Sequence, residues 1–193
     1  SGGLSHSVLG GIGIAYFLGM NEYMGAIIFA LLAAGIMSYF HFHARENENV
    51  LINALWAIGM ALGIIFMYLT PGYNVDLGSY IFGSLIILSL QDLLLIGGLS
   101  LFILLILLFY YRQFIAYAFD PEHAQLKGIK TPWIYTILLI IISLSVVVLL
   151  RITGILLLIA IFTLPSAIAR LWSDRIPLII ILSFGICLLS IYG

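Results

Sequence analysis

The chain has 193 residues, of which 64% are hydrophobic and 8% charged, and its formal net charge is −1. A soluble domain carries roughly a quarter of its residues as charged side chains, and a nucleic-acid-binding protein needs a basic surface, so the composition excludes both classes. Its high hydrophobicity also excludes a disordered chain. The composition therefore predicts an all-α, polytopic helical membrane protein.

Seven apolar segments separated by polar residues are the predicted transmembrane helices. They are residues 7–20, 24–42, 50–69, 93–111, 133–150, 154–171 and 177 onward. A bilayer core of about 30 Å needs about 20 helical residues, which most of these segments approach. The first segment is short and the last is still apolar at the end of the sequence, so we expect further elements beyond both ends. Residues 1–193 are predicted to form one transmembrane domain.

An eighth apolar segment, residues 78–88 (GSYIFGSLIIL), lies between the third and fourth spans. As a helix it would cover about half of the membrane. We therefore expect a short re-entrant or outer interfacial helix here.

The basic residues predict the orientation of the chain. With seven alternating spans, six of them fall on one side: Arg45, Arg112, Lys127, Lys130, Arg170 and Arg175. Only Arg151 falls on the other side. Because cytoplasmic loops carry an excess of lysine and arginine, residues 43–49, 112–132 and 170–176 are predicted to face the cytoplasm.

The predicted spans carry almost no ionisable side chains between their ends. Ion-driven transporters place such groups near the middle of the membrane, so their scarcity indicates an external energy source or passive transport. The sequence also lacks the phosphate-loop pattern G-x-x-x-x-G-K-[ST] and the protease motifs H-E-x-x-H and G-x-S-x-G. We therefore expect no enzymatic activity in this chain itself.

The cytoplasmic segment 119–130 (FDPEHAQLKGIK) is predicted to contain a helix of about two turns, Pro121–Lys127. Asp120 is a favourable N-cap, Pro121 suits the first helical position, and Glu122 complements the positive end of the helix dipole. Gly128 can take the left-handed conformation that ends a helix.

The apolar side chains of this segment are predicted to form a docking face that the membrane does not explain: Phe119, Ala124, Leu126 and Ile129. The alternative is an interfacial loop that lies on lipid headgroups.

His6 is the titratable side chain expected within a span and away from its ends, and imidazole binds Zn²⁺, Mn²⁺ or Fe²⁺. One histidine cannot make a metal site alone, so a second chain would have to contribute. The alternative is a histidine hydrogen-bonded to a nearby carbonyl. His41 and His43 are expected to be interfacial side chains rather than ligands. Rows of small residues predict close helix packing: Gly11, Ala15 and Gly19, and Gly59 with Gly63.

Four segments in order resemble the permease subunit of prokaryotic zinc/manganese/iron ABC importers. They are LSHSVLGG at 4–11, TPGYNVDLGSYIFGS at 70–84, FDPEHAQLKGI at 119–129 and RITGILLLIAIFTLPSAIARLWS at 151–173. The first is similar to the family's L-S-H-A-x-x-P-G, and the third to its coupling helix. Many members carry an acidic residue four positions before the histidine, where this chain has Gly2, and Gly10 replaces the family's proline.

The resemblance implies a vitamin B12-importer-like (type II) permease fold in the prokaryotic plasma membrane, usually with eight spans. It implies a homodimer that transports a divalent metal ion without binding a cofactor tightly. The other implied partners are two cytoplasmic P-loop ATPases, whose groove holds the coupling helix, and an external metal-binding protein. His6 would then line the translocation path. In the coupling helix, Asp120, Pro121, Glu122, Ala124, Leu126 and Gly128 match the family.

Two alternatives remain open at the level of sequence. The same fold also serves uptake of iron–siderophore chelates and cobalamin, and a passive channel or membrane scaffold is an alternative from a different class. The sequence does not distinguish among the metals, nor does it assign a role to Asp76 in the outer loop.

Overall fold

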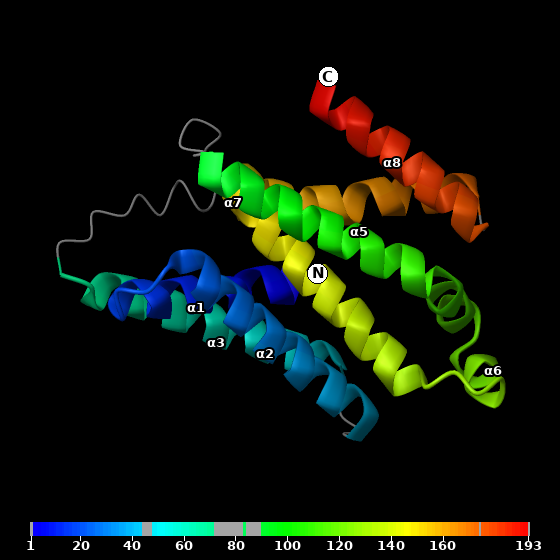
Figure 1. Cartoon of the computed structure of the whole chain (residues 1–193), viewed down its shortest axis with the longest axis horizontal. Coiled ribbons are helices and arrows are strands. Elements are labelled where there is room, and N and C mark those ends of the chain that lie inside the picture. The colour runs from blue at the N-terminus through cyan, green and yellow to red at the C-terminus, as the bar shows by residue number, and fades with distance from the viewer. Residues whose placement is uncertain (1, 44–47, 72–82, 84–89, 174, 193) are drawn as a thin grey trace.

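The computed structural model describes residues 2–43, 48–71, 83, 90–173 and 175–192, and every element in these ranges is a helix. The helices are α1 (Gly2–Phe17), α2 (Glu22–His43), α3 (Glu48–Leu69), α5 (Leu90–Phe119), α6 (Pro121–Leu126), α7 (Thr131–Trp172) and α8 (Ile176–Tyr192). The all-α prediction is confirmed for these residues (Figure 1).

Among the described residues, 5 helical segments are long and apolar enough to cross a membrane. They are Glu22–His43, Val50–Leu69, Leu93–Phe119, Thr131–Leu150 and Ile152–Trp172. The other two of the seven expected spans correspond to shorter helices, namely α1 with 16 residues and α8 with 17. The chain is therefore a multi-pass membrane protein.

Small residues bring α1 into backbone contact with both of its neighbours. A Cβ atom on Gly11 would lie 2.3 Å from the carbonyl oxygen of Gly25 in α2, and one on Gly13 would lie 2.4 Å from that of Gly63 in α3. The contact between α3 and α1 is equally close at Gly59 of α3, where a Cβ would lie 2.4 Å from the Cα of Ser7 in α1. Such close approach is how membrane helices gain dispersion energy and weak hydrogen bonds. Helices α1, α2 and α3 thus form one tightly packed unit.

Gly19 does not belong to this packing row, contrary to the sequence prediction. Its φ is +66° and no atom lies within 4 Å of the position a Cβ would take. Its N–H donates to the carbonyl of Tyr16 (3.0 Å), and the N–H of Met20 donates to that of Ala15 (2.8 Å). These two bonds end α1, so Gly19 is needed for its backbone conformation.

Helix α5 extends eight residues beyond the predicted end of the span at Tyr111 and stops at Phe119. The charged Arg112 suggested a loop, but no Gly, Pro or Asp follows it until Asp120 and Pro121, so the helix continues. The outer surface of α5 is apolar and strongly exposed, as expected for a helix in contact with lipid.

Helix α7 contains two of the predicted spans, 133–150 and 154–171, and residues 151–153 between them are helical rather than a loop. Its only non-helical residue is Gly154, with φ 70° and ψ 172°. In Figure 1 both halves of α7 run from this break towards the right of the view. Gly83 approaches the break so closely that a Cβ on it would lie 2.6 Å from the carbonyl carbon of Thr153. The rest of the expected outer helix at 78–88 lies outside the described residues.

Alternate helix ends gather on opposite sides of the bundle. Helix α6, the end of α2, the start of α7 and the junction of α7 with α8 lie towards the right of Figure 1. The α1–α2 turn, the end of α3, the start of α5 and the break in α7 lie towards the left. This arrangement agrees with the alternation predicted from charge, in which the α6 side faces the cytoplasm.

Candidate functional site

The first turn of α6 is capped as its sequence predicts. Asp120 has an extended conformation (φ −157°, ψ 101°), and its carboxylate accepts a hydrogen bond of 3.0 Å from the N–H of His123. Its carbonyl accepts a bond from the N–H of Ala124 at 3.0 Å. Pro121 occupies the first turn, where its missing N–H has no cost. The start of α6 is thus fixed by local chemistry.

The last turn of α6 ends in a Schellman motif. Gly128 has φ +82°, and its N–H donates to the carbonyl of Gln125 (2.9 Å). The N–H of Ile129 donates to the carbonyl of Ala124 (3.1 Å). These are the two bonds that define the motif. Lys127 is the C-cap, so α6 is one residue shorter than predicted but ends as expected.

The predicted apolar docking face is divided between the protein interior and the solvent. Ala124 is 1% exposed, and Ile129 is half-buried. Leu126 and Phe119, by contrast, are 86% and 66% exposed. The sequence alone does not predict which of these side chains are buried, because the burial of Ala124 depends on how α6 packs against α5 and α7. Of the four apolar side chains, Leu126 and Phe119 are thus the exposed ones, and the charged Glu122 beside them is exposed too.

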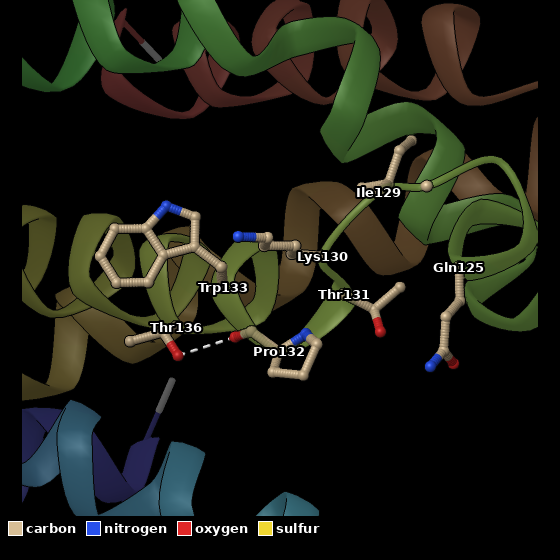
Figure 2. A pocket seen from close by; sticks show the side chains of 8 residues that line it. Gln125, Ile129, Lys130, Thr131, Pro132, Trp133 and Thr136 are labelled. Atoms are coloured by element: carbon tan, nitrogen blue, oxygen red, sulfur yellow. Dashed lines mark hydrogen bonds between the residues drawn. The ribbon is translucent and has the colours of Figure 1, made fainter.

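A hollow of about 550 Å³ lies beside α6, at the start of α7 (Figure 2). None of its lining residues is acidic; they are Gln125, Gly128, Ile129, Lys130, Thr131, Pro132, Trp133 and Thr136. The hydroxyl of Thr136 donates to the carbonyl of Pro132 (2.8 Å), as drawn in Figure 2. Residues 128–130 of the connection from α6 to α7 thus form part of the wall of this hollow.

His6 lies in α1 between two buried serines, Ser5 and Ser7. Its ring centroid is 5.2 Å from that of Trp56 in α3, with an interplanar angle of 40°. Its Nδ1 atom is buried and has no hydrogen-bond partner in the part of the chain that the structure describes. No group of three His, Cys, Asp or Glu that could hold a metal ion is found among the described residues. A complete metal site is therefore not assembled by one copy of these segments.

The two histidines at the end of α2 make aromatic contacts. The ring of His41 stacks on Tyr135 of α7, with centroids 4.1 Å apart and planes 20° apart. The ring of His43 stacks on Tyr39 of its own helix at 4.5 Å and 11°. Their expected interfacial role stands as a prediction, but the contact with Tyr135 was not expected, because it joins distant parts of the sequence. Asp76 lies outside the described residues.

The described residues form a bundle of apolar helices, several of them long enough to cross a membrane, with the short capped helix α6 at one end of the bundle. The chain belongs to the ABC 3 transport family, whose sequence profile matches residues 1–193.

Two similar proteins and one solved structure are informative. The chain is 34% identical over 190 residues to the manganese transport system membrane protein MntC of Halalkalibacterium halodurans, covering 98% of this chain and 63% of that protein. It is 34% identical over 186 residues to an uncharacterised membrane protein of Synechocystis, covering 96% and 66%. The structure of PsaBC from Streptococcus pneumoniae in complex with Fab matches with a TM-score of 0.81 and 27% identity, over 96% of this chain and 67% of that one. The chain thus spans slightly less than two thirds of these two relatives.

Proposed function

We propose that this chain is the permease subunit of an ATP-driven importer that moves divalent metal ions into the cell, with manganese favoured over zinc and iron. A relative of 34% identity is named a manganese transport system membrane protein. The observation that carries the proposal is α6, a helix capped at both ends, in a chain whose sequence contains no phosphate loop. Energy must then come from a separate subunit, and this chain is not itself an enzyme.

In this proposal α6 is the coupling helix and sits in a groove of a cytoplasmic P-loop ATPase. Asp120, Pro121 and Gly128 fix its two ends, and Ala124 anchors it to the bundle. Glu122 and Leu126 are exposed and make the contact with the ATPase. An apolar side chain that is 86% exposed outside the membrane is well suited to a partner's apolar pocket.

The metal path in this proposal lies between two copies of the chain in a type II, vitamin B12-importer-like arrangement. Each copy contributes His6, whose Nδ1 lacks a partner among the described residues and is available as a ligand. Because Gly2 replaces an acidic residue, the path offers imidazole without the family's carboxylate. Binding is then transient, and an external metal-binding protein holds the ion tightly before delivery.

The test uses the full-length permease, reconstituted in liposomes with its ATPase and external binding protein. We expect ATP-dependent manganese uptake and co-purification of the ATPase. Leu126→Asp is expected to abolish both, because it places a charge in the apolar contact, whereas Leu126→Met retains both. Uptake without nucleotide would favour a passive channel instead. Normal ATPase binding by Leu126→Asp would contradict the role given to α6.

A further inference from the structure

The start of α7 follows the end of α6 after a connection of four residues, 127–130. The Schellman motif of α6 leads into α7 through Gly128, Ile129 and Lys130. On either side of this connection Ala124 and Ile134 are buried, at 1% and 2% exposed. A displacement of α6 would reach the first turns of α7 through this short connection.

Those first turns of α7 touch the last turns of α2 through a specific set of side chains. The ring of Tyr135 is stacked on His41 at 4.1 Å and 20°, and the edge-on ring of Phe42 lies 5.5 Å from it. The hydroxyl oxygens of Ser38 and Thr136 are 2.6 Å apart, although these residues are 98 positions apart in sequence. We call this set of five residues the α2–α7 clasp.

The hydrogen bond in the clasp has a defined direction. Thr136 has one hydroxyl proton, which it donates to the carbonyl of Pro132 at 2.8 Å. Ser38 must therefore be the donor to Thr136, and Thr136 must be the acceptor. Ser38 is 7% exposed, so loss of this acceptor leaves a buried donor unpaired. The contact thus holds the two helices in one register.

On its other side, α2 is locked to the helix that carries His6. A Cβ on Gly25 of α2 would lie 2.4 Å from the carbonyl oxygen of Gly11 and 2.5 Å from the Cβ of Ala15, both in α1. The backbones of α2 and α1 therefore lie in close contact at this point, with no room for a larger side chain between them. Because α1 and α2 are packed this closely, a movement of the end of α2 would displace α1 and His6 with it.

We propose that the α2–α7 clasp is the link through which movement of α6 is delivered to the helices that carry His6, with Tyr135 and Thr136 as positioning residues for transport. The inference rests on the proposed function, since it needs α6 to be driven by an ATPase. The clasp stays closed as the transporter changes state, because a link that opened would release α2 from the moving helix.

The test measures manganese uptake and ATP hydrolysis in the same proteoliposomes. Tyr135→Ala and Thr136→Val are expected to bind the ATPase and hydrolyse ATP at the wild-type rate, with uptake per ATP reduced about fivefold or more. Tyr135→Phe keeps the ring and is expected to keep the ratio. The matched control is His43→Ala, which loses a stack of similar geometry within a single helix. An unchanged ratio in both Tyr135→Ala and Thr136→Val overturns the inference.

A cross-link tests the clasp without weakening the fold. Ser38→Cys and Thr136→Cys are combined in a Cys187→Ser background, which removes the chain's single native cysteine. With the disulfide formed, uptake per ATP is expected to equal that of the wild type, because the covalent link replaces the hydrogen bond between Ser38 and Thr136. Uptake that stops on oxidation and returns on reduction means that the helices part during transport, and it overturns the inference.

The wild-type reconstitution distinguishes failure of the proposed function from failure of this inference alone. If it shows neither ATPase binding nor ATP-dependent uptake, the proposed function fails and this inference falls with it. If wild-type coupling is normal and the clasp variants match it, the inference alone fails.

Discussion

Replacing Gly128 by alanine isolates the backbone strain at the end of α6. The residue has φ +82°, and no atom lies within 4 Å of the position a Cβ would take, so alanine adds strain without a clash. An L-residue in the left-handed region costs about 1–2 kcal/mol. That cost raises the population of an unwound α6 end by a factor of about 5–30.

Hydrogen exchange measured by mass spectrometry on the full chain reports this opening. The amides of Gly128 and Ile129 donate the two bonds of the Schellman motif, so their exchange is expected to accelerate by the same factor of about 5–30. Affinity for the ATPase is expected to weaken by no more than this factor, because binding must re-form the helix end.

The matched control is Gly19→Ala. Gly19 has φ +66° and equally open surroundings, but it ends α1 on the opposite side of the bundle. It should show the same local rise in exchange with no change in ATPase affinity. If the amides of residues 128 and 129 exchange at the wild-type rate in Gly128→Ala, the predicted backbone strain at position 128 is refuted. If both variants affect ATPase binding equally, the coupling role of α6 is refuted.

Two further predictions concern the start of α6 and the packing of α1. Asp120→Ala removes the acceptor for the His123 amide and should destabilise α6 by about 1 kcal/mol, which hydrogen exchange would report as faster exchange at His123. Asp120→Asn keeps an acceptor oxygen and should keep the wild-type exchange rate. Equal exchange rates in the two variants would contradict the capping role of Asp120. Gly13→Leu forces α1 away from α3 and should cost about 1–3 kcal/mol, measured as a lower melting temperature of the detergent-purified chain. The control is Gly97→Leu on α5, where no atom lies within 4 Å of the position a Cβ would take, and it should leave the melting temperature unchanged. An equal fall in melting temperature in both variants would show that the effect of Gly13→Leu is not due to packing.

The features that were predictable from sequence are those governed by neighbouring residues. The caps of α6 follow from Asp120, Pro121 and Gly128, which act on amides within a few positions. The break at Gly154 was missed because Arg151 suggested a polar loop, whereas a single glycine in the left-handed region turns the chain. The stack of His41 on Tyr135 depends on how α2 packs against α7, which no local signal encodes. His6 was identified from sequence, but its role as a ligand stays a prediction because it needs a second copy of the chain.

The break in α7 also determines where this protein can be labelled from outside. Because Gly154 joins the two halves of α7 without a linker and its backbone is pressed against Gly83, residues 152–154 are buried or half-buried and offer no exposed strip for an inserted epitope or a protease site. The turn from Leu18 to Asn21 lies on the same side of the bundle and is exposed throughout. A tag that tests in intact cells whether this side faces outward, as the charge pattern predicts, therefore belongs in that turn, between α1 and α2.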